Sequence, residues 1–400
     1  MRTDLRRSPR PGLAVAAVSA ALVLALQALS VNLNYGGNWS GLFCHGQDFA
    51  VPPSLEKEEI YRFPGSGYDG QFYHVIAHDP FFRRGLHRYV DDPRLRYRRI
   101  LVPGLAHVLV GGRDSAVDTA YRAVVLLFLA LGSFWLSRFA SRHGRSPWWG
   151  LAFPLVPAAW VSIDRLTVDV ALAALTVGFV LHGGERPGPV MLALLALAGL
   201  GRETGLLLPM AYGLFQLLRR AWRAAVLAGA AMVPAVAWFV FVNAHTEPRP
   251  YAHDFVPLRG IVSAWTSASP PAPVPGGLSP LMTRSKRIAR VVDGVLEKVA
   301  LAGAVLGIGL AAASARRRPQ GPDALVALLF ALMAVFVQRA DHWSHAYDYG
   351  RVYSPLLVVL ALRSLSSAAV LPAVPTLLMW PRLLFQVRTQ VLGFVRPFFS

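Results

Sequence analysis

Long apolar runs recur along this chain, separated by short polar or arginine-rich turns. Each run holds roughly 16 to 24 residues, the length that a helix needs to cross the hydrocarbon core of a bilayer. The runs predict spanning helices at about 13–33, 116–139, 147–162, 165–182, 222–243, 295–314, 323–338 and 352–369. With a split stretch at 188–219 and an apolar tail from 370, the chain is predicted to be all-α, a polytopic membrane protein with about 10–11 transmembrane helices.

Two long polar segments break this pattern, and we expect both on the extracytoplasmic side. The first, 34–115, contains amphipathic stretches and is expected to carry amphipathic helices. The second, 244–294, is rich in proline and serine and is expected to be irregular. Neither resembles a separate soluble domain, so 1–400 is predicted to form a single membrane domain with a cytoplasmic tail at 1–12.

The apolar stretch 188–219 is interrupted by the polar residues 201–205. Basic residues lie near both of its ends, and the positive-inside rule places both ends in the cytoplasm. A hairpin of two short helices satisfies both ends and puts Arg202 and Glu203 at its outer tip.

Composition changes this picture little. Hydrophobic residues make up 54% of the chain and charged residues only 16%, whereas soluble domains carry about 25% charged residues. Much of the net charge of +18 comes from arginines beside helix ends, so it does not imply a nucleic-acid partner. The single cysteine, Cys44, excludes an intrachain disulfide. Cys44, His45 and Asp48 receive no predicted role.

The unusual polar clusters all fall on one predicted side of the membrane. They are the segment 34–99, Asp164 with Asp169, the pair Arg202-Glu203, and the segment 338–351. Ionisable residues at membrane depth are costly, so these clusters are candidate functional sites.

Asp69 is the leading candidate, because Tyr73 and Ala77 follow it at helical spacing in the first polar segment. Two readings are open for its carboxylate. It could cap the helix that follows a turn at 64–67, or it could be a general base or metal ligand that activates an acceptor hydroxyl. The neighbouring Tyr68, Gln71 and Tyr73 favour the second reading, with these three as substrate-binding residues.

Four arginines follow on the same outer side, at positions 94, 96, 98 and 99. They could extend towards lipid headgroups. Alternatively, one or two of them could hold a phosphate through bidentate guanidinium contacts. On that reading Arg96, Arg98 and Arg99 are the candidate binding residues.

Asp164 and Asp169 are five residues apart at the predicted outer start of the helix 165–182. A helix cap explains Asp164. Asp169 is expected about one turn inside, where it needs a partner such as Arg165, Arg202 or a metal. Glu203 is expected to form a local ion pair with Arg202 at the hairpin tip, and Arg202 could also reach a phosphate.

The last cluster, 341–351, has a His-x-x-His spacing, but no second ligand pair accompanies it, so a structural zinc is not favoured. An aromatic, hydrogen-bonding loop that closes over a sugar or phosphate fits better, with His345 and Arg351 as binding residues. The chain has no P-loop, Rossmann glycine pattern or Gly-x-Ser-x-Gly motif, which disfavours a nucleotide-driven cytoplasmic enzyme.

These features resemble the GT-C superfamily of integral membrane glycosyltransferases, in the protein O-mannosyltransferase and aminoarabinose transferase-like branch. Asp69, Tyr73 and Ala77 match the helix that opens the first outer loop of that branch. Gly70 departs from it, because the family usually has Glu there. Further matches are the stretch 99–105, Asp169, the hairpin 202–205 and, by position only, Arg351.

The resemblance implies a polyprenyl-phosphate sugar donor, used on the extracytoplasmic side of the membrane. It implies a multi-pass protein of a bacterial-type plasma membrane. It implies an inverting displacement in which Asp69 takes the proton of an acceptor hydroxyl, and the acceptor could be a glycan, a lipid or a protein. Arginines then neutralise the departing lipid phosphate. A divalent metal cofactor is left open, and membrane lipids are further expected partners.

Two rival functions remain open at this point. A transporter or flippase of a lipid-linked or anionic substrate would use broken helices and charges near the membrane midplane. The sequence shows no convincing internal repeat, and it has the long segment 34–115. Both observations argue against a transporter. A non-catalytic membrane subunit could share the same architecture, since fold does not fix function.

Overall fold

The structure is a computed structural model that describes residues 10–56, 59–184, 187–248, 256–266, 280–315, 321–337 and 340–395. The described chain is almost entirely helical. Its two strands, β1 (His45–Gly46) and β2 (Arg62–Phe63), form one short parallel pair. The all-α prediction is therefore confirmed for these residues.

Short helices and turns build the first polar segment. They are η1 (Trp39–Phe43), α2 (Pro53–Glu56), α3 (Gly70–His78), η2 (Leu86–Tyr89), α4 (Pro93–Arg96) and α5 (Leu101–Leu109). The apolar helices before and after this segment are α1 (Arg10–Asn34), α6 (Asp114–Arg142), η3 (Pro147–Leu155), α7 (Pro157–Arg165), α8 (Asp169–His182), α9 (Pro189–Gly201), η4 (Glu203–Leu206), α10 (Leu207–Leu218), α11 (Trp222–Ala230) and α12 (Val233–His245).

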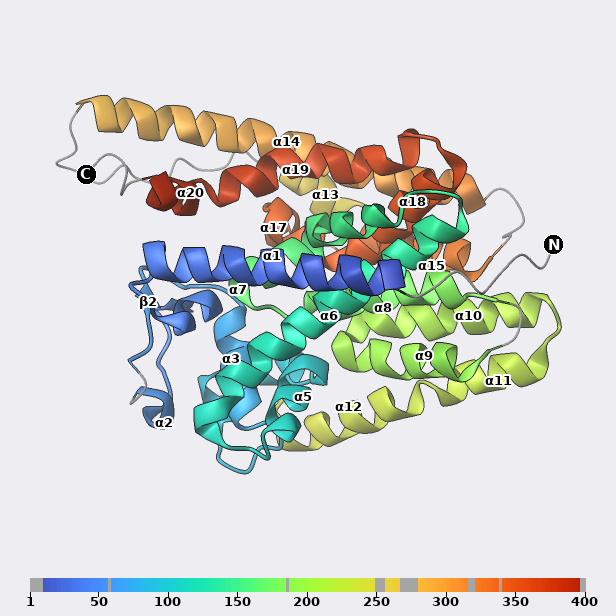
Figure 1. The fold of residues 1–400 in the computed structure, drawn as a ribbon, viewed down its shortest axis with the longest axis horizontal. Helices are drawn as coiled ribbons and strands as arrows, with labels where there is room; N and C mark the ends of the chain where they lie inside the picture. Colours follow the sequence, from blue (N-terminus) through green and yellow to red (C-terminus); the bar gives the residue numbers. More distant parts are fainter. Residues whose placement is uncertain are drawn as a thin grey trace.

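The remaining elements form the second half of the fold. They are α13 (Arg259–Thr266), α14 (Pro280–Ala315), α15 (Pro322–Phe336), α16 (Ala340–Trp343), α17 (Ala346–Val352), α18 (Ser354–Ser367), η5 (Leu371–Ala373), α19 (Val374–Gln386) and α20 (Arg388–Val395). Helix α19 packs along α14, and α20 packs against α1 (Figure 1). The apolar tail is thus part of the packed helical body.

Four helical stretches of the described chain are long and apolar enough to cross a membrane: Arg10–Asn34, Asp114–Arg142, Trp222–His245 and Arg287–Ser314. Their apolar side chains are only partly covered by the rest of the protein. In Trp222–His245, for example, 17% of the most apolar window is buried. Exposed apolar surface of this extent on long helices fits contact with lipid.

Two predicted elements differ in the structure. The expected helices 147–162 and 165–182 become η3, α7 and α8, because Pro154 and Pro157 interrupt the first and Leu166 adopts a left-handed φ of 44°. The segment 244–294, expected to be irregular, contains α13 and the beginning of α14. Its residues 249–255 and 267–279 lie outside the described part.

The predicted hairpin agrees with the structure, since α9 and α10 are joined by η4 at Glu203. Helix α6 ends at Arg142, and Arg219 follows the last residue of α10. Figure 1 shows α2, β2 and α3 at the left and the α10–α11 connection at the right. In this view the first polar segment therefore lies away from the basic α10–α11 connection.

Candidate functional site

Asp69 is the residue before α3, yet its side chain does not cap the helix. Both of its guanidinium contacts are made by Oδ2, one to Arg96 at 2.6 Å and one to Arg351. The capping reading of Asp69 is therefore wrong, and the carboxylate is committed to an ion-pair network. Only 15% of its side chain is exposed, so these charges interact largely out of water.

Arg351, from α17, connects three carboxylates. Besides Asp69, its guanidinium approaches Asp169 at 3.3 Å and Asp348 at 3.6 Å. The Tyr68 ring lies 5.0 Å from the guanidinium carbon, and the Tyr68 hydroxyl donates a hydrogen bond of 2.6 Å to Asp348. These contacts place Tyr68 and Arg351, two of the predicted substrate-binding residues, beside Asp69.

Asp169 contacts Arg202, one of its predicted partners, and also Arg351. It is the first residue of α8 and not one turn inside, because the left-handed Leu166 ends the preceding helix early. Asp164 lies in α7 and belongs to another group, with Tyr347, Gln390 and Arg165.

Arg99 forms a bidentate pair with Glu203, with both N–O distances at 2.8 Å, and also donates to the Tyr73 hydroxyl at 2.8 Å. The predicted local pair between Arg202 and Glu203 is much looser, with Nε 3.7 Å from the carboxylate. The Arg99–Glu203 ion pair thus connects the tip of the hairpin to the first polar segment, and the Tyr73 hydroxyl lies beside this ion pair.

Burial and charge act in opposite directions on these carboxyls. Burial alone raises the pKa of Asp69, but Arg351 and Arg96 outweigh it and hold the pKa well below its usual range. Burial also raises the pKa of Glu203, and Arg99 and Arg202 bring it down to about 2. Both groups are carboxylates at neutral pH.

Several buried polar atoms around this network have no hydrogen-bond partner among the described residues. They are Arg202 Nε, Arg351 Nε, Thr204 Oγ1, His342 Nε2 and the Tyr353 hydroxyl. Burial, together with the positive charges of Arg202 and Arg351, lowers the pKa of His342 to about 4. Buried donors without acceptors are uncommon in folded proteins, and they mark a place where a polar ligand can bind.

Gly70 explains why no second carboxylate follows Asp69. A Cβ atom at this position would lie 2.0 Å from the Arg165 carbonyl oxygen and 2.8 Å from that of Phe43. No side chain fits between α3 and these two backbone segments. The departure from the family pattern therefore has a packing cause in this chain.

Three predicted site residues lie elsewhere. Arg98 donates to Asn243 at the end of α12. Gln71 bonds to the backbone of Gly46 and Ser66, and so holds the loop in front of α3. His345 is 59% exposed and pairs with Glu297 at 3.5 Å. Spacing along the chain does not distinguish Arg98 from Arg96 and Arg99.

The structure adds residues that the sequence did not single out. Asp348 pairs with Tyr68 and Arg351, and its place three residues before Arg351 on a helix was a usable signal. Asp91 holds Arg96 at 2.9 Å, and the buried His342 replaces His345 beside the arginines. The carboxylates of this network all face guanidinium groups.

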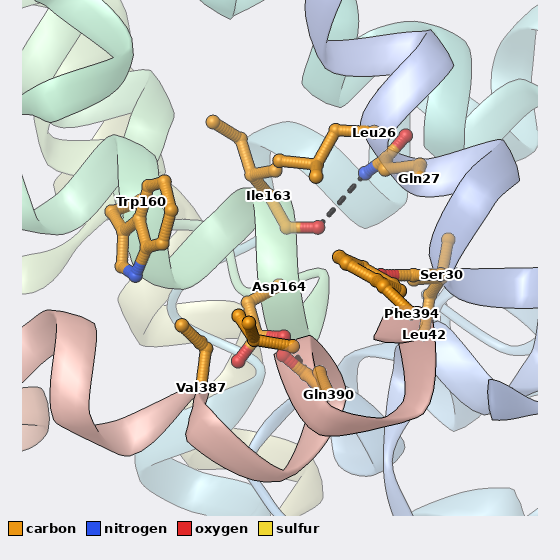
Figure 2. A pocket seen from close by; sticks show the side chains of 11 residues that line it. Leu26, Gln27, Ser30, Leu42, Trp160, Ile163, Asp164, Val387, Gln390 and Phe394 are labelled. Carbon is orange, nitrogen blue, oxygen red and sulfur yellow. Dashed lines mark hydrogen bonds between the residues drawn. The ribbon is translucent and has the colours of Figure 1, made fainter. Parts of the chain in front are cut away.

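An apolar pocket lies next to the network, between α1, α7 and α20. Figure 2 shows Leu26 and Gln27 on one wall, Trp160 and Ile163 on another, and Phe394 across from them. Its polar end is formed by Asp164, which accepts a hydrogen bond of 2.7 Å from Gln390. Asp164 also bonds to Tyr347, whose ring packs edge-on against Tyr68 at 5.7 Å.

Comparisons of this chain with known protein families, with curated proteins and with solved structures find no match.

Proposed function

We propose that this protein is a membrane glycosyltransferase. It moves a sugar from a polyprenyl-phosphate donor to an acceptor hydroxyl on the extracytoplasmic side, with Asp69 as general base. The observation that carries the proposal is the placement of Asp69: its carboxylate starts a helix that it does not cap and instead meets Arg96 and Arg351.

The orientation in the membrane follows from the positive-inside rule. Arginine clusters 138–145 and 219–223 lie at the C-terminal ends of α6 and α10, whose N-terminal ends lie at His78 and next to the hairpin tip at Glu203. If those clusters face the cytoplasm, the network faces the other side. A donor on that side must carry its own activated leaving group, and a lipid phosphate does so without a nucleotide.

The unpartnered donors support a phosphate in this site. Arg202 Nε and Arg351 Nε are buried and lack an acceptor within the described chain, and guanidinium groups match phosphate oxygens in geometry. His342 and Tyr353 add a ring nitrogen and a hydroxyl that could bind sugar hydroxyls. The apolar pocket beside Asp164 offers a surface for the lipid chain of the donor.

The reaction is a single displacement at the anomeric carbon of the sugar. The acceptor oxygen forms the new bond to this carbon while the bond to the phosphate oxygen breaks with its electron pair. Asp69 takes the acceptor proton and later releases it to solvent. Arg351 and Arg202 stabilise the charge that develops on the leaving phosphate.

Donor binding would also change Asp69 itself. Phosphate oxygens compete with the carboxylate for the same guanidinium groups. As the phosphate draws Arg351 away, the pKa of Asp69 rises from its depressed value towards the ordinary range, and the carboxylate becomes a stronger base. The ion pairs of the free protein thus keep the base weak until a donor is present.

The test is a transfer assay with purified protein and a panel of radiolabelled polyprenyl-phosphate sugars. Asp69→Asn keeps the side-chain shape and removes the base, so we expect transfer to fall about 10²–10⁴-fold. Asp48→Asn, an exposed aspartate in the same segment, is the matched control and should retain the wild-type rate.

Thermal unfolding of each variant checks that a lost rate reflects chemistry and not misfolding. Unchanged transfer by folded Asp69→Asn would remove Asp69 from the base role. No turnover of any donor by the wild-type protein would contradict the enzyme and favour transport or a non-catalytic subunit.

A further inference from the structure

Two histidines and two aspartates form a second polar cluster at the C-terminal end of α3. His74 and His78 are four residues apart on α3, and Asp114 and Asp118 are four apart on α6, so each pair lies on one helix face. Both histidine side chains are fully buried, whereas 28% of the Asp118 side chain is exposed.

The two imidazoles point at the same oxygen atom. His74 Nε2 lies 2.8 Å and His78 Nε2 lies 3.2 Å from Asp118 Oδ1. These three atoms lie within 4.8 Å of one another. Two ligand atoms about 2.0–2.1 Å from a tetrahedral zinc ion are themselves roughly 3.3 Å apart, so little movement is needed to admit a cation.

The other ring nitrogens are held by a second set of partners. His74 Nδ1 lies 2.8 Å from His45 Nε2, and His78 Nδ1 lies 2.8 Å from Asp114 Oδ1. Phe43 stacks on the His74 ring with centroids 4.1 Å apart. Outer contacts of this kind fix the tautomer and direction of metal-binding imidazoles in metalloproteins.

Hydrogen bonds alone can also satisfy this cluster, but only if His78 carries two ring protons, because both of its nitrogens face carboxylates. A bound cation makes that unnecessary. His78 then gives up its Nε2 proton, and His74 exchanges its Nε2 proton for one on Nδ1, which it donates to His45 Nε2. His45, the donor in the metal-free cluster, correspondingly carries its own proton on Nδ1. One proton is released to solvent for each cation bound.

We infer that His74, His78 and Asp118 form a binding site for a divalent cation of the Zn²⁺ type. Two imidazole nitrogens and one carboxylate oxygen are ligands that such cations prefer. The partly exposed Asp118 gives access from solvent, and the fourth position is open to water. The site does not depend on the glycosyltransferase proposal, and its role is to clamp α3, which begins at Gly70 beside Asp69, onto α6.

The test uses tag-free, full-length protein in detergent, stripped with EDTA and titrated with Zn²⁺ and with Co²⁺. We expect one equivalent of Zn²⁺ per chain and a visible Co²⁺ spectrum of tetrahedral type. His78→Asn and Asp118→Asn should weaken Zn²⁺ binding at least about 100-fold, and Asp114→Asn, an outer partner, about 10–100-fold. His143→Asn, an exposed histidine at the far end of α6, should bind as the wild type does.

Substoichiometric binding by the wild type, or equal binding by His78→Asn and His143→Asn, would overturn the site. Asp114→Asn serves if a ligand variant fails to fold, because it leaves all three ligands in place. Unchanged affinity in that variant would likewise contradict the proposed arrangement.

Discussion

The two ends of α3 show two different ways to hold charge inside a protein. At its N-terminal end, Asp69 meets guanidinium groups from α4 and α17, the farther of them 282 residues along the chain. At its C-terminal end, His74 and His78 meet carboxylates of α6, within 44 residues. One end is assembled across the whole fold and the other by two neighbouring helices.

The difference is also chemical. Guanidinium groups stay charged at any pH that proteins tolerate, so the arginines of the Asp69 end can exchange partners but not protons. Imidazoles can exchange a proton for a cation. The first end therefore suits an anionic ligand, and the second suits a metal.

The largest expected difference between the two ends of α3 comes from the removal of Arg351. Arg351→Ala removes the cation that Asp69 and Asp169 share. Breaking a buried pair costs about 3–5 kcal/mol, and we expect the lower end of this range because Arg96 and Arg202 still face the two carboxylates. Thermal and denaturant unfolding in detergent should show this loss, while Zn²⁺ affinity at the other end of α3 stays unchanged. Arg388→Ala, an exposed arginine on α20, is the control. A loss below 1 kcal/mol would mean that water or other residues compensate for Arg351.

A smaller loss of stability is expected when a side chain is added at the N-terminal end of α3. Gly70→Ala places a methyl group 2.0 Å from a backbone oxygen that cannot move freely, and overpacking of this kind costs about 1–3 kcal/mol. Gly229→Ala, on α11 with open space around it, should be neutral or slightly stabilising. Equal unfolding temperatures for the two variants would show that α3 shifts to make room.

The smallest effect is the pH dependence of the Asp69 end. A carboxyl with a depressed pKa adds stability above its unfolded pKa of about 3.9 and loses it as pH falls through the folded value. For Asp69 and Glu203, that loss begins below about pH 4. Metal-free protein should therefore keep this contribution unchanged from pH 8 to 5. If Asp69→Asn removes a stability change within that window, the low pKa of Asp69 is wrong.

The sequence predicted the fold well where local rules decide it. Apolar run length located α1 and α6, and basic flanks located the hairpin around Glu203. The prediction from the sequence failed where single residues interrupt an apolar run. Pro154, Pro157 and Leu166 divide the predicted continuous helices. The segment 244–294 was expected to be irregular, yet α14 begins within it at Pro280, since proline is compatible with the first turn of a helix.

The sequence identified several charged residues of the candidate site, but it did not show which of them pair with one another. Asp69, Arg96 and Arg351 were named, yet which arginine meets which carboxylate depends on long-range packing. Arg98 is two residues from Arg96 and points to α12 instead. The spacing of His74 and His78 was visible in the sequence, but its meaning required Asp118 on another helix.

The separation of Asp69 from Arg351 also sets an order of events during synthesis. A ribosome adds roughly 5–20 residues per second, so Asp69 emerges many seconds before its farther partner. During that interval α3 exists with its carboxylate half-paired. The nascent chain therefore lacks the complete ion-pair network of Asp69 until its last eighth is being made, and a product truncated before Arg351 cannot form it.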